Sequence, residues 1–187
     1  MDVKVFSDPR KPAYLNFDAG SKPLKDPISP ATLARVRAYR HSRIKQKLAE
    51  HDCAAILVYD PLNIRYATDC SDMQIWTMHN PSRYALIFAE GPTICFEYAQ
   101  ALHLAEGLPM VDEVRPCTSW FYFASGPRLT ESAGKWADEI ADLMHQYGGG
   151  NKRLAVDKIE PLGVDLLRAR GFTLVEGQEL TETARMI

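Results

Sequence analysis

Apolar and polar residues recur in a regular order along the first part of the chain. Ser29-Pro30 is typical of a helix start, because serine caps the first turn and proline needs no hydrogen bond there. From there to about residue 51, apolar residues follow helical spacing and predict a helix that buries Leu33, Val36, Ile44 and Leu48. The apolar run Ala54–Tyr59 that follows predicts a buried strand.

The alternation of strands and helices continues to the end of the sequence. Tyr84–Phe88 and Thr93–Phe96 flank the turn residues Glu90-Gly91-Pro92, which predicts a hairpin. Further strands are predicted at residues 110–115, 153–157 and 172–175, and further helices at residues 99–106, 130–147, 161–170 and 178–187. In the longest of these, Thr130 is the expected N-cap, and one side carries Ala133, Trp136, Ala137, Ile140, Met144 and Tyr147. This order predicts an α/β fold: a three-layer domain with a mixed β-sheet flanked by helices.

The first 28 residues differ from the rest in composition. They are rich in proline, lysine and aspartate, which is typical of an extended segment, and we expect a proline-rich N-terminal arm at residues 1–28. The folded domain is expected to occupy residues 29–187.

Composition and charge exclude several functions. Hydrophobic residues make up 46% of the chain and charged residues 25%, as in ordinary globular proteins. The net charge of −2 argues against nucleic acid as a partner. The first predicted helix does carry a run of basic residues, which we expect to form its solvated face: Arg35, Arg37, Arg40, Arg43, Lys45 and Lys47. No apolar stretch approaches the ~18 residues of a membrane span, so no membrane partner is expected.

The four cysteines indicate a reducing compartment. Cys53, Cys70, Cys95 and Cys117 show no C-x-x-C spacing, so we expect free, buried thiols and a cytoplasmic location. They also lack the compact grouping with histidine that a zinc site needs.

Polar and aromatic residues crowd into the segment after the first predicted strand. Asp60-Pro61 ends that strand, since proline cannot donate to the sheet. Up to residue 83 the segment contains Asn63, Arg65, Tyr66, Thr68, Asp69, Asp72, Gln74, Trp76, His79, Asn80 and Arg83. A polar loop at the carboxyl end of a buried strand is where α/β proteins keep binding sites, but the same residues could simply satisfy the strand end. The sequence leaves both interpretations open.

The side chains of this segment favour binding over catalysis. Arg83 offers a planar fork for a carboxylate, Trp76 and Tyr66 offer stacking faces for a cationic group, and His79 can exchange a proton near neutral pH. H-E-x-x-H and G-x-S-x-G are absent, and neither the Asp69/Asp72 pair nor Cys70 beside His79 has the surroundings that a metal site or an activated thiol requires. The aromatic segment Ser119–Phe123 is expected to pack in the core or at an edge, or else to form an exposed patch that binds another protein.

Three segments resemble one family. The run A-A-I-L-V-Y followed by N-I-R-Y-A-T-D (residues 54–69), then M-Q-I-W-T-M-H-N-P-S-R-Y (73–84) and G-G-G-N-K-R-L-A-V-D (148–157), resembles the amino-terminal domain of the creatinase/prolidase/aminopeptidase P metallohydrolases. Ala67 stands where leucine is common in that family, and Asp69 where glycine is common. The residues of these segments are most similar to those of the subgroup that contains the dimethylsulfoniopropionate lyases.

The resemblance implies that a second domain, and not this one, carries the catalytic site. The family's catalytic domain follows the amino-terminal one and binds two divalent metal ions (Mn, Fe, Zn or Co), or none in creatinase. Residues 184–187 resemble the start of the connecting helix, so that catalytic domain is expected outside this chain, with no catalytic residue, cofactor or metal ligand in the chain itself. Members are commonly homodimers in which this domain reaches over the partner's active site.

The resemblance also implies roles for individual residues of this chain that match positions in the family's motifs. Arg83 matches an arginine that holds the substrate carboxylate in creatinase-like members, and His79 and Trp76 are expected to bind substrate with it. Asn63, Tyr66 and Asp69 belong to the turn motif, with a structural role. The parent protein is then expected to hydrolyse a C–N bond in a small molecule or Xaa-Pro dipeptide, or to act as a lyase on dimethylsulfoniopropionate. A free-standing binding or dimerisation module is the hypothesis from another class.

Overall fold

The computed structural model describes residues 28–186, so the arm expected at residues 1–28 lies almost entirely outside them. The chain divides into two units, Met1–Leu33 and Ala34–Ile187. The described part of the first unit contains the beginning of helix α1 (Pro30–Glu50). There the Ser29 hydroxyl accepts a hydrogen bond from the N–H of Thr32 at 3.2 Å, which confirms serine as the cap of this helix.

The second unit is built on a mixed sheet. Its strands, in spatial order, are β4 (Glu113–Pro116), β3 (Thr93–Glu97), β2 (Tyr84–Phe88), β1 (Ala55–Val58), β5 (Arg153–Val156) and β6 (Thr173–Glu176). The β1–β2 and β2–β3 pairs are antiparallel, whereas β3–β4, β1–β5 and β5–β6 are parallel. The predicted hairpin and the predicted mixed sheet are confirmed.

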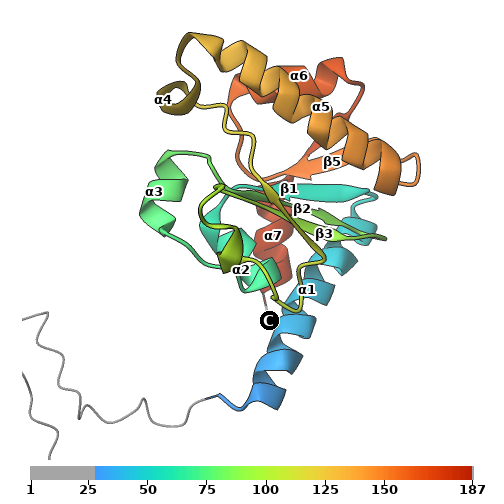
Figure 1. Cartoon of the computed structure of the whole chain (residues 1–187). Helices are drawn as coiled ribbons and strands as arrows, with labels where there is room; N and C mark the ends of the chain where they lie inside the picture. The colour runs from blue at the N-terminus through green and yellow to red at the C-terminus, as the bar shows by residue number, and fades with distance from the viewer. Residues whose placement is uncertain (1–27, 187) are drawn as a thin grey trace, which may run out of the picture. The chain divides into compact units, whose positions relative to one another are not determined.

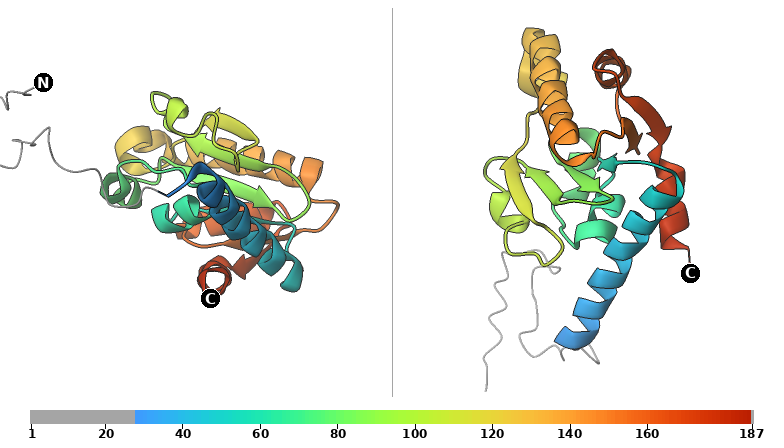
Figure 2. Two further views of the ribbon diagram at one scale, coloured as in Figure 1. Left: turned by 90° about the horizontal axis from the view of Figure 1, so that it is seen from below. Right: turned by 90° about the vertical axis from the view of Figure 1, so that its right-hand side faces the viewer.

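Helices cover both faces of this sheet, which gives the three layers that the sequence predicts (Figure 1). Helices α5 (Leu129–Tyr147) and α6 (Pro161–Ala169) pack on one face. On the other face lie α1, α2 (Pro61–Thr68) and α7 (Gly177–Arg185), and Figure 2 shows α7 running beside α1. Two short helices, α3 (Gln74–His79) and α4 (Tyr122–Ser125), complete the described helices together with 3₁₀ turns at Leu102–Leu104 and Gly126–Arg128.

The core lies on both sides of the central strand. Ile56 and Val58 of β1 point toward α1, α2 and α7, while Ala55 and Leu57 point toward α5. All four residues of β1 are buried, as expected for a strand with helices on both faces. The helix α5 buries the predicted apolar side, including Trp136.

Several sequence predictions are wrong in detail. The segment after β1 is not a loop: Pro61 ends the strand and also starts α2, since the Asp60 side chain accepts the N–H of Leu62 at 2.8 Å and caps the helix. Residues 99–106 form only a 3₁₀ turn at Leu102–Leu104. Helix α5 already begins at Leu129, directly after a 3₁₀ turn, so Thr130 is not its N-cap.

The aromatic segment Ser119–Phe123 divides between the two alternatives that the sequence left open. Trp120 is buried and stacks at a tilt on Trp136, with 4.7 Å between ring centroids. Tyr122 and Phe123, on α4, are exposed. Within residues 28–186, no helix combines the length and hydrophobicity that crossing a membrane requires.

Candidate functional site

The carboxyl ends of β1 and β5 frame a polar hollow of about 280 Å³. Parallel neighbours place their carboxyl ends at one edge of a sheet, which is where open α/β sheets bind ligands. Asp60 and Lys158 face each other there, with 2.8 Å between Nζ and Oδ2. The hollow is lined by Tyr59, Asp60, Pro61, Thr77, Met78, His79, Pro81, Lys158, Ile159 and Glu160.

The charge of Asp60 is set by its surroundings. Burial acts to raise the pKa of Asp60, but the hydrogen bonds from Lys158 and from the N–H of Leu62 outweigh it and lower the pKa. The carboxylate is therefore ionised at neutral pH and occupied in capping α2. It is poorly suited to accept a proton from a substrate.

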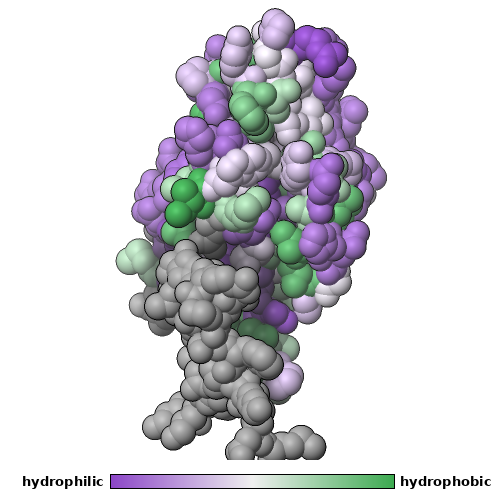
Figure 3. All heavy atoms as spheres, turned by 60° about the vertical axis from the view of Figure 1, so that its left-hand side comes forward, coloured by the Kyte–Doolittle hydropathy of each residue, from purple (hydrophilic) through white to green (hydrophobic). Residues whose placement is uncertain are grey.

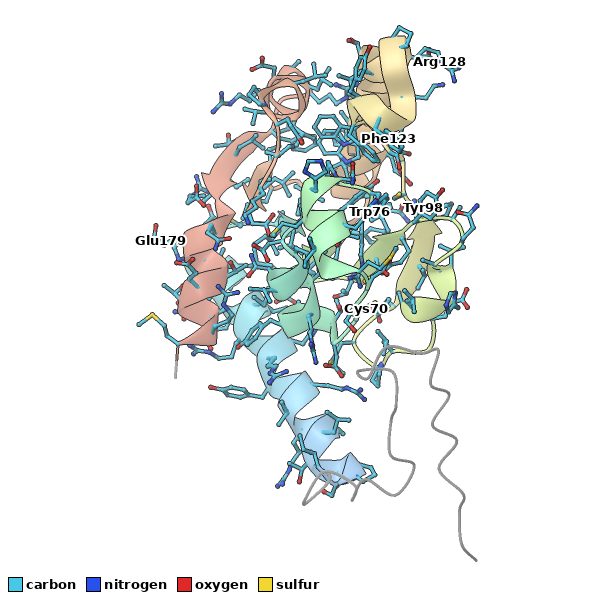
Figure 4. All side chains as sticks on the ribbon, turned by 90° about the vertical axis from the view of Figure 1, so that its left-hand side faces the viewer. Cys70, Trp76, Tyr98, Phe123, Arg128 and Glu179 are labelled. Atoms are coloured by element: carbon cyan, nitrogen blue, oxygen red, sulfur yellow. The ribbon has the colours of Figure 1, made fainter. Side chains whose placement is uncertain are left out.

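A second hollow, of about 550 Å³, is almost entirely apolar and lies along α3. It is lined by Met73, Ile75, Trp76, His79 and Asn80. Ile75 is 83% exposed and Met78 61%, which is unusual for side chains of this size. The Trp76 ring meets that of Tyr98 edge-on, with 6.4 Å between centroids, and Figure 4 shows the two rings side by side. Apolar side chains interrupt the polar surface on this side of the molecule (Figure 3).

Two of the three predicted substrate-binding residues come together here. Trp76 and His79 both line the apolar hollow, and His79 also lines the polar one. The last turn of α3 thus joins an aromatic face, an imidazole and the Asp60–Lys158 pair. Such a surface suits a small ligand that has both an apolar or cationic part and a polar part.

Arg83 lies elsewhere, inside the fold. Its Nε donates to Oε1 of Glu97 at 2.7 Å, and both side chains are 1% exposed. Both terminal nitrogens of Arg83 and Oε2 of Glu97 are buried without a hydrogen-bond partner in the described structure. The structure does not test the predicted carboxylate-binding role of Arg83. The two terminal nitrogens have no partner among the described residues, but they are buried, so an anion would have to enter the fold to reach them.

Cys70 packs against the same ion pair. Its Sγ lies 3.3 Å from Oε1 of Glu97 and 3.1 Å from the carbonyl oxygen of Leu104. Burial raises the pKa of Cys70 to about 12, so the thiol stays protonated at neutral pH and is a poor nucleophile. All four cysteines are free in the described structure; Cys53, Cys70 and Cys95 are buried as predicted, whereas Cys117 is only half-buried.

The motif residues Asn63 and Tyr66 lie on helix α2 and not in a turn, and Asp69 directly follows this helix as its C-cap. Asp69 ends α2 in the left-handed conformation, with φ of 63°, which explains why glycine is common at this position in the family. The Asp69 carboxylate also binds Arg37 of α1 at 2.6 Å. Asn63 and Tyr66 contact α7: the amide of Asn63 binds Gln178 and Arg185, and the Tyr66 hydroxyl donates to the carbonyl oxygen of Ala184.

The described residues do not offer a donor set for a metal. Within residues 28–186, no group of three or more histidine, cysteine, aspartate and glutamate side chains could hold an ion. Asp69, one of the candidate carboxylates, is already bound to Arg37. We therefore derive no catalytic step through a metal in this part of the chain.

The fold and these features define an α/β domain of the creatinase/prolidase N-terminal type. The family model "Creatinase/Prolidase N-terminal domain" matches residues 40–187, and the chain belongs to this family. A structure of an Xaa-Pro aminopeptidase from Streptococcus pyogenes is similar over 81% of this chain and 99% of that one, with a TM-score of 0.59 and 17% identity. At that identity the likeness concerns the fold alone.

Two curated relatives are more similar in sequence. Dimethylsulfoniopropionate lyase DddP of Roseovarius nubinhibens is 42% identical over 155 residues, which are 83% of this chain and 35% of that protein. DddP of Roseobacter denitrificans is 39% identical over the same shares. The chain thus spans about a third of the length of the curated relatives that it matches.

The solvated face predicted for the basic residues of α1 is wrong for several of them. Arg37 binds Asp69, Lys45 donates to the carbonyl oxygen of Gly91, Arg43 donates to the end of α7, and the guanidinium of Arg40 lies over the Tyr66 ring. An α-helix turns by about 100° per residue, so these basic residues lie around much of the helix and not on one face. Their spacing does not show which of them another element covers.

Proposed function

We propose that this chain is the accessory domain of a larger enzyme and that the surface of α3 forms part of its substrate pocket. The observation that carries the proposal is the joining of Trp76 and His79 in one exposed, largely apolar hollow beside a polar one. A surface of this kind has no structural purpose in an isolated domain, because exposing large apolar side chains to water costs free energy.

The reaction chemistry, in this proposal, belongs to another part of the polypeptide. The metal ions of the family's catalytic domains, or the metal-free chemistry of creatinase, would reside there. Support comes from the lack of a metal donor set in residues 28–186 and from the chain's 35% share of its relatives' length. The exposed side chains of α3 would be covered by that domain or by a second copy of the protein in a homodimer.

The cleavage of dimethylsulfoniopropionate is the parent reaction that we favour. The relatives at 42% and 39% identity carry that name, whereas the likeness to peptidases rests on the fold. This substrate carries a sulfonium cation, and an indole face such as that of Trp76 attracts cations. Hydrolysis of a C–N bond in an Xaa-Pro dipeptide or a creatine-like molecule is the second candidate.

The purified chain is expected to be inactive by itself. It is mixed with Mn²⁺ and either dimethylsulfoniopropionate or a panel of Xaa-Pro dipeptides, and dimethyl sulfide and free proline are measured. We expect no turnover by the chain and turnover of one substrate class by the intact polypeptide, whose homodimer is checked by light scattering. Turnover by the chain alone would contradict the proposal. A stop codon directly after residue 187 in the gene would favour the free-standing module instead.

Replacing Trp76 in the intact enzyme is expected to weaken substrate binding. Trp76→Ala removes the aromatic face, and the loss of a cation–π contact worth ~0.5–2 kcal/mol raises KM roughly 2- to 30-fold. Trp76→Phe, which keeps an aromatic ring, has a smaller effect. Phe123→Ala is the control, since Phe123 is equally aromatic and more exposed but lines neither hollow. An unchanged KM in Trp76→Ala removes this residue from the site.

A further inference from the structure

Side chains from two other helices hold the carboxyl end of α7. The last carbonyl groups of any helix lack partners within the helix and must be satisfied by something else. In α7, the carbonyl oxygen of Ala184 accepts from the Tyr66 hydroxyl of α2 at 2.8 Å and from Nε of Arg43 of α1 at 3.3 Å. Arg43 Nη2 also donates to the carbonyl oxygen of Thr183 at 3.3 Å and to that of Met186, one residue past the helix, at 3.2 Å.

Asn63 adds a third attachment and uses every polar atom of its side chain. Its Nδ2 donates to Asp157 at 3.0 Å and to Gln178 at 3.2 Å, and its Oδ1 accepts from Nη1 of Arg185 at 2.6 Å. The orientation of the amide is fixed, since a carboxylate can only accept and a guanidinium can only donate. Asn63 is 1% exposed, so its own polar atoms are shielded from solvent, although its partners Gln178 and Arg185 are half-buried.

The geometry differs from that of an ordinary helix end. Helices often stop at a glycine in the left-handed conformation, which turns the chain back on itself. Here Met186 is extended, with φ of −67° and ψ of 132°, and its carbonyl oxygen is still held by Arg43. The backbone is thus fixed beyond the helix, in a direction that leads away from it. A cap that only satisfied α7 would not need to reach Met186.

We propose that Arg43, Asn63 and Tyr66 form an exit clamp, which sets the direction in which the polypeptide leaves this domain and thereby positions the part that follows. The clamp explains why the N-I-R-Y residues belong together: α2 carries Asn63 and Tyr66 on the side that faces α7. These are positioning residues and touch no substrate. That a further part follows, and the effect of these residues on catalysis, rest on the proposed function; the hydrogen bonds at the end of α7 do not.

Amide hydrogen exchange at Arg185 and Met186 tests the clamp without any substrate. In the full chain, the double variant Arg43→Met/Tyr66→Phe is expected to exchange these amides at least about tenfold faster, the change for a loss of ~1.4 kcal/mol, because at least one net hydrogen bond is lost. Amides of β1 and β2 keep their rates. The matched control is Arg65→Met/Tyr122→Phe, which makes the same chemical changes at side chains exposed to solvent.

Two outcomes overturn the clamp: equal exchange at residues 185–186 in the double variant and the wild type, or equal acceleration in the control. If the double variant fails to fold, Tyr66→Phe alone decides, since it removes one hydroxyl and keeps the ring. For that variant we expect about threefold faster exchange at residues 185–186, and no change there contradicts the clamp.

Positioning is tested in the intact enzyme. Misplacement of about 1 Å at a reacting centre can cost 10²-fold in rate, so kcat/KM of the double variant is expected to fall about tenfold or more, with the control unchanged. The single variant Arg43→Lys, with Tyr66 unchanged, should lose less kcat/KM than the double variant. Its ammonium keeps the charge but cannot reach three carbonyl groups. Faster exchange with unchanged kcat/KM would show a local cap and refute positioning. An inactive intact wild type would instead refute the proposed function.

Discussion

Replacing Arg83 by alanine is expected to lower the free energy of unfolding by about 3–5 kcal/mol. The change leaves the Glu97 carboxylate buried without its cation, and Glu97 is 0% exposed. Its Oε2 has no hydrogen-bond partner among the described residues, and the weak thiol donor of Cys70 at Oε1 does not replace the cation. The loss is measured by urea unfolding at pH 7, from the midpoint and the slope of the transition.

A surface pair of the same chemistry provides the control. Arg115 Nε binds Oε1 of Glu113 at 2.6 Å, but the two side chains are 30% and 40% exposed. Arg115→Ala is therefore expected to cost no more than about 1 kcal/mol. If Arg83→Ala and Arg115→Ala lowered the free energy of unfolding equally, burial would not be the reason for the large effect at Arg83.

The stability of the same variant should depend more strongly on pH than that of the wild type. Burial raises the pKa of Glu97 even beside Arg83, because a single hydrogen bond from the guanidinium returns less than desolvation costs. Without the cation the folded-state pKa rises further above that of the unfolded chain. The stability of Arg83→Ala is then greatest below the unfolded value of ~4.3 and falls as pH rises through the folded value. A profile parallel to that of the wild type would refute this.

The predicted role of Arg83 in binding a carboxylate can be tested separately from stability. The double variant Arg83→Met/Glu97→Leu replaces the ion pair by apolar groups of similar volume, which is often neutral or stabilising. It should therefore recover most of the loss. An unchanged KM in the intact enzyme carrying this double change would remove Arg83 from the substrate site, and a raised KM would place it there.

The elements that the sequence predicts best are those whose apolar residues form an unbroken run or follow one regular spacing. The strand β1, the β2–β3 hairpin and the inner side of α5 follow directly from the spacing of apolar residues. Helices α2 and α3 do not follow from the apolar spacing, because both are short and carry many polar residues. Asp60-Pro61 is equally a helix start, with an acidic cap followed by proline at the first position.

The candidate site was predicted in part, and the hairpin register could have corrected the rest. The turn at Glu90-Gly91-Pro92 pairs Tyr84 with Phe96, which sets Arg83 directly opposite Glu97. Opposite charges that face each other across two central strands form a pair, and this signal was available before the structure. The contacts at the end of α7 were not predictable, since they join residues about 120–140 positions apart on three helices.

Replacing Gly177 by alanine is expected to destabilise the domain by roughly 2–3 kcal/mol through steric overlap alone. Gly177 is the first residue of α7, and a methyl group there would lie 2.6–2.8 Å from the backbone N, C and O atoms of Val156 in β5. The backbone of a central strand cannot rotate away as a flexible side chain can. Helix α7 must therefore move as a whole, or the contact with β5 must open.

Gly134 allows this steric effect to be separated from the general effect of removing a glycine. It lies inside α5, and an added methyl group would meet nothing within 4 Å, so Gly134→Ala is expected to stabilise the domain by about 0.5–1 kcal/mol. Urea unfolding of both variants shows whether each change lowers or raises the free energy of unfolding. Stabilisation by both would show that α7 is not packed against β5 as tightly as the structure indicates. The same helix ends in the exit clamp. A displaced α7 in Gly177→Ala should therefore also speed amide exchange at Met186, although Arg43 and Tyr66 are not mutated in this variant.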